Sequence, residues 1–209
     1  MGIRLGVLIS GGGTTLQNFL DEIEAGRLDA EVAVVISSSG KAYGLERARK
    51  HGVPTEVIRR KVFVGPEEYG VAIAEVLDRH EVELVTMAGF LRLWRIPERY
   101  QGRVLNIHPA LIPAFCGQDM YGHRVHEAVV ETGAKVSGCT VHFADNEYDT
   151  GPIIIQRTVP VYFEDGPDDV ARRVFEQECI AYPEAIRLFA AGRLKIVGRR
   201  VEIRGEKAD

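Results

Sequence analysis

The stretch IRLGVLISGGGTTLQNFLDEIEAG, from Ile3 to Gly26, decides the fold because it joins a strand pattern to a helix pattern through a run of glycines. The apolar run from Ile3 to Ser10 predicts a buried strand. After it, apolar residues recur at helical spacing, at Leu16, Phe19, Leu20 and Ile23. This spacing predicts an amphipathic helix that begins at Thr14 and stops near Gly26. A strand that leads directly into a helix is the first half of a β-α-β unit.

The same alternation continues through the first half of the chain. Further strands are expected over residues 31–38, 55–58, 82–90 and 103–108, and helices over residues 42–52 and 67–80. Parallel strands joined by right-handed crossovers place helices on both faces of the sheet. The sequence therefore predicts an α/β fold with an open, mostly parallel, twisted sheet of the Rossmann-like type.

The pattern changes after residue 108. A loop and a helix over residues 123–133 precede two longer strand runs, residues 137–144 and 152–161, whose short connection favours antiparallel pairing. A long helix over residues 167–192 is expected to close the fold. The length of 209 residues and the hydrophobic content of 45% fit one continuous domain with a C-terminal extension.

Charge and cysteine usage exclude several classes of protein. The net charge of −4 predicts no basic patch for nucleic acid, and no apolar stretch approaches the ~20 residues of a membrane span. The first residues run straight into a strand without a signal-peptide pattern. The three cysteines lack metal-site spacing and are expected to be free thiols in a reducing compartment, at Cys116, Cys139 and Cys179. We therefore expect a soluble cytoplasmic protein, monomeric or homodimeric, that acts on small molecules.

Three glycines, Gly11 to Gly13, lie between the first strand and the first helix. Backbone amides at a helix N-terminus can bind a phosphate. The run lacks the third glycine of a dinucleotide motif and the lysine of a P-loop. A tight turn capped by Thr14 or Thr15 is the alternative interpretation, and the sequence leaves both open.

Asn106 and His108 stand two residues apart at the end of an apolar run. Residues at this spacing project from the same side of a strand, and the carboxyl edge of an open α/β sheet is where ligands bind. An asparagine can donate to a developing oxyanion while a histidine moves a proton, which is what acyl-type transfer requires. A buried structural pair is the alternative.

Asp149, in NEYDTGPI, could hold the His108 imidazole in one orientation and raise its pKa. An aspartate before a glycine turn is also ordinary turn chemistry. Among the other histidines, His123 and His126 lie three apart on a helix and His142 lies inside a strand pattern. No third metal ligand has suitable spacing, so these three are interpreted as structural.

Together, SGGGTTLQ, MAGFLRL, NIHPALIP and DTGPIIIQ occur in the order seen in phosphoribosylglycinamide formyltransferases. The whole chain resembles that family. The resemblance implies the formyltransferase fold, with a nucleotide-binding half over residues 1–105 and a catalytic and folate-binding half over residues 106–209. It also implies transfer of a formyl group from the co-substrate 10-formyltetrahydrofolate to the amine of glycinamide ribonucleotide in purine synthesis, without a metal.

By the same resemblance, Asn106, His108 and Asp149 match the catalytic residues. Asn106 would hydrogen-bond the formyl oxygen, His108 would donate a proton and stabilise the oxyanion, and Asp149 would raise the histidine pKa and fix its position. The resemblance assigns the ribonucleotide to Gly13, Thr14, Thr15 and Glu178. It assigns the folate to Leu91, Arg92, Leu93, Trp94 and Asn106, and its pterin to the loop with Asp145, Asn146, Glu147 and Tyr148.

The chain departs from the family pattern in three places. Thr14-Thr15 replaces a common Ser-Asn pair, Gly65-Pro66 replaces a basic residue, and the loop over residues 115–123 is longer than in some relatives. Two competing functions stay open. A folate-dependent hydrolase could use the same Asn, His and Asp, but it needs no phosphate loop. A non-catalytic nucleotide-binding module would leave those three residues without a shared purpose.

Overall fold

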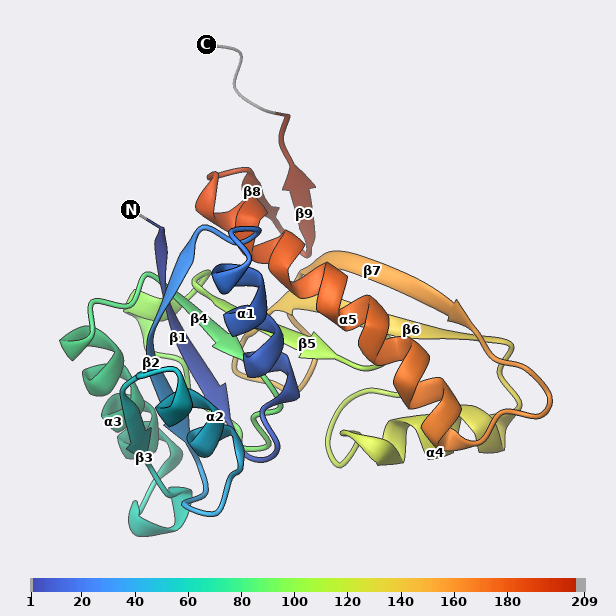
Figure 1. Cartoon of the computed structure of the whole chain (residues 1–209), viewed down its shortest axis with the longest axis horizontal. Coiled ribbons are helices and arrows are strands. Elements are labelled where there is room, and N and C mark those ends of the chain that lie inside the picture. The colour runs from blue at the N-terminus through green and yellow to red at the C-terminus, as the bar shows by residue number, and fades with distance from the viewer. Residues whose placement is uncertain (1, 206–209) are drawn as a thin grey trace. The chain divides into compact units, whose positions relative to one another are not determined.

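The computed structural model describes residues 2–205, which form two compact units (Figure 1). The first unit ends at Asn106 and the second begins at Ile107. No helix within residues 2–205 is long and apolar enough to cross a membrane.

The first unit alternates strands and helices as the sequence predicts. Its elements in chain order are β1 (Ile3–Ile9), α1 (Thr14–Glu24), β2 (Ala30–Ser37), α2 (Gly44–Lys50), β3 (Thr55–Val57), the 3₁₀ helix η1 (Arg60–Val62), α3 (Pro66–Arg79), β4 (Leu84–Met87), the 3₁₀ helix η2 (Glu98–Tyr100) and β5 (Val104–His108), which runs across the boundary between the units.

The strands of this unit lie in the order β3-β2-β1-β4-β5, and all their pairings are parallel. Figure 1 shows α1 and α2 beside each other against these strands. The chain moves from β1 outward to β3 and then crosses back through α3 to β4 on the other side of β1. Right-handed crossovers that run in opposite directions lie on opposite faces of the sheet. The strand order therefore reverses between β1 and β4, which is where open α/β sheets bind ligands.

Burial explains why these segments form strands and helices. After their first two residues, β1 and β2 are buried without interruption to their carboxyl ends, as strands covered on both faces should be. On α1, the buried residues are Leu16, Phe19 and Leu20, which lie on the face that the helical spacing predicts. Pro66 opens α3 as its first residue, a position where its missing N–H breaks no helical hydrogen bond.

The second unit contains α4 (His123–Thr132), β6 (Val136–Phe143), β7 (Ile153–Pro160), α5 (Pro167–Ala190), β8 (Leu194–Val197) and β9 (Arg200–Ile203). Strands β6 and β7 pair antiparallel, as expected, and α5 packs on both of them and on α4. Beyond β7 the order continues through β9 to β8, with β7 and β9 parallel and β8 and β9 antiparallel.

The α/β class, the mostly parallel pairing and the antiparallel C-terminal part are confirmed. One expectation is wrong, because the long helix α5 does not close the fold. A hairpin of β8 and β9 follows it, joined by the two residues Gly198 and Arg199. The alternating runs LKIV and RVEI on either side of a glycine are a hairpin signal that could have revealed it.

Candidate functional site

Residues Gly11–Thr15, here called the glycine loop, connect β1 to α1. Gly13 has a left-handed φ of 70°, and a Cβ placed on it would lie 2.6 Å from the Cα of Gly44 at the start of α2. Only glycine fits both this conformation and this close approach. Gly13 is therefore explained by packing, whatever binds to the loop.

Gly11 and Gly12 have no such explanation, because a Cβ on either would meet no atom within 4 Å. The Gly11 carbonyl accepts from the Gly44 N–H at 3.1 Å, and the Gly12 carbonyl accepts from Arg47 Nε at 3.0 Å. In a trans peptide the C=O and N–H point in opposite directions. The N–H groups of Gly12 and Gly13 therefore point away from α2.

The N-terminus of α1 lacks a side-chain cap. The N-cap residue is Gly13, no side chain bonds the first turn, and that turn contains no acidic residue. The alternative of a turn capped by Thr14 or Thr15 is therefore wrong, since both threonines lie inside the helix. An uncapped helix N-terminus with a positive dipole potential favours an anion.

The LRLW segment, residues 91–94, lies in the loop after β4, the strand that pairs with β1. The Ser10 N–H donates to the Gly89 carbonyl at 3.1 Å, and the Leu91 N–H donates to Ser10 Oγ at 2.9 Å, so this loop is joined to the end of β1. Leu91 and Arg92 are exposed. Trp94 is only 2% exposed, and its Nε1 donates to the Gly70 carbonyl at 3.1 Å. Its side chain belongs to the core.

His108, the last residue of β5, is 3% exposed. Its Nε2 donates to the Phe115 carbonyl at 2.8 Å, and its Nδ1 lies 3.5 Å from Asp149 Oδ2. The structure thus brings together two residues that are 41 positions apart in sequence. Asn106, two residues before His108 on β5, is aligned with Met87 of β4.

Asp149 lies in the turn between β6 and β7 with a left-handed φ of 57°. Its Oδ2 accepts from the Gly117 N–H at 2.9 Å, and its Oδ1 lies 3.7 Å from His142 Nε2. Two residues later, a Cβ on Gly151 would overlap the Phe143 carbonyl oxygen, so glycine allows the close approach that returns this turn to His142 on β6. Asp149 is a turn residue and also a partner of two histidines.

His108, His142 and Asp149 form what we call the histidine–aspartate cluster. His142 Nδ1 donates to the Phe143 carbonyl at 2.8 Å. Each ring therefore has one nitrogen on a carbonyl and the other facing the carboxylate, and a carbonyl or an ionised carboxylate only accepts. This arrangement gives a doubly protonated His108 ring an acceptor on both sides, and the charge of Asp149 favours that protonated form.

Burial and charge oppose each other in the cluster. Burial lowers the pKa of His108 below its ordinary value, with a smaller lowering from His142, and the charge of Asp149 and the bond to Phe115 only partly offset this. Burial also acts to raise the pKa of Asp149. The two histidines and the Gly117 N–H outweigh it and hold that pKa below its usual range. The carboxylate of Asp149 is thus ionised at neutral pH beside a buried histidine whose pKa is lowered.

The sequence did not indicate three of these contacts. The sequence pattern indicates a structural residue in a strand for His142, although its position seven residues before Asp149, at the start of the connection between β6 and β7, could have paired them. Phe115 and Gly117 act through backbone atoms of the long loop between β5 and α4. Backbone contacts leave no side-chain signal in the sequence.

The remaining expected site residues of the second unit lie in two places. Asp145 accepts from the Glu147 N–H and the Thr150 hydroxyl, which folds the loop, while Glu147 and Tyr148 are exposed and Asn146 is partly exposed. Glu178 is half-buried on α5, and desolvation raises its pKa to about 7.

Around His123 and His126, as elsewhere within residues 2–205, no group of three potential metal ligands occurs. His123 is exposed and contacts Glu127 and Asp168, which raise its pKa. His126 is buried, and its Nδ1 has no hydrogen-bond partner among the described residues. Burial, with help from the nearby His123 and His108, lowers its pKa to about 4.

Comparison with known proteins bears on this geometry. Residues 3–186 match the formyl transferase family. A phosphoribosylglycinamide formyltransferase from Haemophilus influenzae is 38% identical over 92% of this chain and 90% of its own length. The crystal structure of glycinamide ribonucleotide transformylase 1 from Symbiobacterium toebii superimposes with a TM-score of 0.90 at 48% identity, over 98% of this chain and 95% of the other.

The chain also matches part of a longer protein. The trifunctional purine biosynthetic protein adenosine-3 of Gallus gallus is 38% identical over 93% of this chain, which spans only 19% of that protein's length.

Proposed function

The chain belongs to the formyl transferase family, and we propose that it moves the formyl group of 10-formyltetrahydrofolate onto the amine of phosphoribosylglycinamide. Its activity is accordingly that of a formyltransferase of purine biosynthesis. The observation that carries the proposal within this chain is the contact between His108 and Asp149, because it gives a buried histidine an ionised partner.

In the proposed reaction, the substrate amine attacks the formyl carbon and forms a tetrahedral intermediate with a negative oxygen. His108, protonated for this step, stabilises the negative oxygen and gives its proton to the folate nitrogen, so that the C–N bond to the folate breaks as the C=O bond forms again. The neutral imidazole then takes the proton that the amine nitrogen loses, the new C–N bond is kept, and His108 ends the step protonated again. Asp149 stabilises the imidazolium cation and fixes the ring. Asn106, on the same strand, donates its amide N–H to the formyl oxygen.

The Nε2 of His108 is bound to the Phe115 carbonyl in this structure, while Nδ1 faces Asp149. For Nε2 to reach the reacting oxygen, it must exchange the Phe115 carbonyl for the substrate. We therefore propose that the loop bearing Phe115 moves when the substrates bind. Phe115 has an unfavourable left-handed φ of 49°, which lowers the barrier to leaving this conformation.

We assign the ribonucleotide phosphate to the glycine loop. The support is the outward-facing N–H groups of Gly12 and Gly13, the open space at Gly11 and Gly12, and the uncapped start of α1 at Thr14 and Thr15. Glu178 remains our choice for a contact to the ribonucleotide. With a pKa of about 7 it can exchange a proton near neutrality.

For the folate we retain the exposed Leu91 and Arg92, with Leu93, and the loop from Asp145 to Tyr148. The Trp94 side chain is enclosed by the core and contributes by holding this segment. We do not propose that it touches the folate.

The competing hydrolase would pass the formyl group to water. Both functions can use the histidine–aspartate cluster, but a hydrolase has no use for the phosphate-binding features of the glycine loop. The test incubates the chain with 10-formyltetrahydrofolate, with and without phosphoribosylglycinamide, and measures formylated product and free formate in parallel. We expect product that depends on the ribonucleotide and little formate. Formate release at the same rate without the ribonucleotide would identify a hydrolase.

A further inference from the structure

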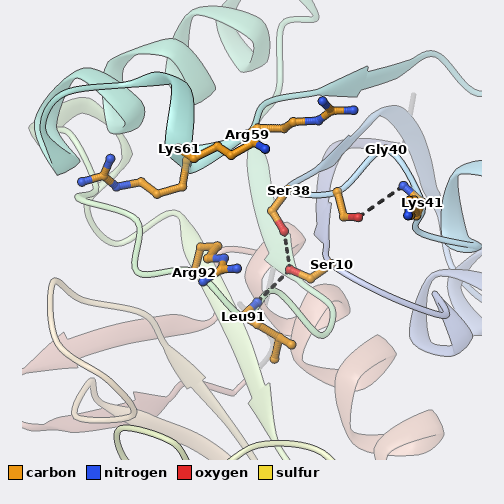
Figure 2. A pocket seen from close by; sticks show the side chains of 10 residues that line it. Ser10, Ser38, Gly40, Lys41, Arg59, Lys61, Leu91 and Arg92 are labelled. Atoms are coloured by element: carbon orange, nitrogen blue, oxygen red, sulfur yellow. Dashed lines mark hydrogen bonds between the residues drawn. The ribbon is translucent and has the colours of Figure 1, made fainter.

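The residue before the glycine loop, Ser10, fixes the point where the loop leaves β1. Its N–H donates to the Gly89 carbonyl at 3.1 Å. Figure 2 shows its side chain bonded to Ser38, with 2.7 Å between the two Oγ atoms, and to the Leu91 N–H at 2.9 Å. These contacts join the carboxyl end of β1 to the loops after β2 and β4. Beyond this fixed point, the orientation of the loop peptides depends on what their own carbonyl groups bind.

Arg47 of α2 binds the glycine loop directly. Its Nε donates to the Gly12 carbonyl at 3.0 Å, and its Nη1 donates to Gln17 Oε1 on α1 at 3.1 Å. A Cβ placed on Gly13 would lie 3.6 Å from the Arg47 Cδ, so the side chain packs along the loop. The guanidinium carbon also lies 5.1 Å from the centre of the Tyr43 ring, within the range of a cation–π contact. Together these contacts hold the arginine between α2 and the start of α1.

The bond from Arg47 to the Gly12 carbonyl orients a donor on the opposite side of the loop. In a trans peptide the C=O and N–H point in opposite directions, so the Gly13 N–H faces away from Arg47. Hydrogen bonds in a chain polarise one another. A cation on the carbonyl therefore makes the N–H of the same peptide a stronger donor, which a neutral side chain would do less well.

The charge of Arg47 is also left without a carboxylate. Within residues 2–205 no ion pair is recorded for Arg47, whereas Arg49 on the same helix is paired with Glu46. The guanidinium has five N–H donors, and the recorded bonds use two of them. The glycine loop contains no lysine of the kind that accompanies the phosphates in a P-loop. Arg47 thus brings a positive charge to a loop that has none of its own.

We propose that Arg47 is a positioning residue for the ribonucleotide phosphate. It acts through the peptide between Gly12 and Gly13, which it orients and polarises, and its unpaired charge adds to the attraction for a phosphate dianion. This rests on the proposed function, because it takes the phosphate to lie at the glycine loop. Since Arg47 acts on the phosphate and not on the reacting atoms, its loss should raise the KM of the ribonucleotide and change kcat little.

The test compares two ligands that differ only in the phosphate. These are phosphoribosylglycinamide and the same compound without its phosphate, each titrated into the whole chain in a calorimeter. The ratio of their dissociation constants measures what the phosphate contributes to binding. Equal binding of both ligands by the unsubstituted chain would overturn the phosphate site of the proposed function and the role of Arg47 with it. When the phosphorylated ligand binds more tightly, the phosphate site stands and the variants of Arg47 decide its role.

Arg47→Gln removes the charge and keeps a polar side chain. Arg49→Gln makes the same change on the same helix, at an exposed position that has no recorded contact with the glycine loop among the described residues. We expect Arg47→Gln to weaken binding of the phosphorylated ligand about 10-fold and to leave binding of the other ligand nearly unchanged. Arg49→Gln should alter neither. Arg47→Lys keeps the charge without the planar fork and should recover part of the loss.

A purely structural role of Arg47 predicts a different result. If Arg47 only packs α2 against the loop, Arg47→Gln weakens binding of both ligands by the same factor, and the ratio of the two dissociation constants stays as in Arg49→Gln. That outcome overturns the proposal. If Arg47→Gln does not fold, Arg47→Lys is compared with Arg49→Gln in its place, and an unchanged ratio in Arg47→Lys likewise overturns the proposal.

Discussion

The glycine loop and the histidine–aspartate cluster are built in opposite ways. The glycine loop is continuous in sequence and exposed at Gly11 and Gly12. Within residues 2–205, no hydrogen bond is recorded from the backbone N–H groups of Gly12 and Gly13. The cluster is assembled from β5, β6 and a turn, is almost fully buried, and has every ring nitrogen facing a protein oxygen. The difference indicates that the glycine loop acts by binding a ligand, whereas the cluster acts by changing the pKa of a proton donor, His108.

Loss of His108 is expected to have the largest effect. General acid–base groups contribute about 10²–10⁴-fold to rate, so His108→Ala should lower kcat by that factor with a small change in the KM of the ribonucleotide. The measurement is steady-state formyl transfer by a variant whose unfolding transition matches the unsubstituted chain. Near-normal turnover by such a folded variant would contradict the proposed role of the cluster.

Asp149→Asn should reduce kcat by less than His108→Ala, because it removes a charge partner and keeps the proton donor. The charge of Asp149 raises the pKa of His108 against the effect of burial, so the pKa of His108 should fall further in this variant. NMR titration of the His108 ring measures it. Glu147→Gln, a neutralised exposed carboxylate of the same loop, should leave the titration as it is. An unchanged titration in folded Asp149→Asn would reduce Asp149 to a turn residue.

In the glycine loop, Gly12→Val should act on binding alone. Its side chain would enter open space on the loop, where we place the phosphate, and hydrogen bonds to charged groups contribute enough that losing one or two weakens binding about 10- to 100-fold. The KM of the ribonucleotide should rise by that factor while kcat changes little.

Gly13→Val is the informative counterpart to Gly12→Val. It should destabilise the fold itself, because Gly13 has a positive φ and packs against Gly44. Equal stability of the two variants in thermal unfolding would show that packing does not distinguish these glycines.

Acid sensitivity should be associated with buried histidines of the second unit. His126 has a pKa of about 4 in the folded chain, against 6.5 for an ordinary histidine, so the unfolded state binds more protons as the pH falls below 6.5. The free energy of unfolding should therefore drop by about 2 kcal/mol between pH 8 and pH 5 through this residue. The measurement is unfolding by denaturant at both pH values. In His126→Leu, the drop in the free energy of unfolding should be smaller by that amount.

His123→Leu is the control with the opposite sign. Its pKa is raised in the folded chain, so His123 stabilises at pH below its unfolded value and loses this effect as the pH rises through the folded value. Removing it should make the chain slightly less stable in acid. An equal acid response in both variants would show that burial of His126 is not the cause.

Sequence patterns predicted most of the fold because buried strands and amphipathic helices leave periodic signals. The helix over residues 123–133 and the antiparallel runs over residues 137–144 and 152–161 correspond to α4, β6 and β7. The β8–β9 hairpin was missed because its strands have only four residues each and are mostly exposed, so the alternation on either side of Gly198 is a short and weak signal.

For the candidate site, the sequence singled out Asn106, His108 and Asp149 but could not show how the last two meet. The resemblance also assigned Trp94 to the folate. In the structure its indole is enclosed by the core and packs there. Residue type and spacing do not distinguish an aromatic side chain that faces a ligand from one that faces the protein interior.

By itself, the sequence determined the strand–glycine–helix start, the α/β class and the residues capable of proton transfer, because these depend on local spacing and side-chain chemistry. Only the tertiary structure decided that Gly13 is required by Gly44, that His142 shares Asp149 with His108, and that Phe115 and Gly117 contact the cluster through backbone atoms. Those contacts join residues up to 41 positions apart. Local pattern cannot encode them, because burial and distance arise only when the strands and turns pack together.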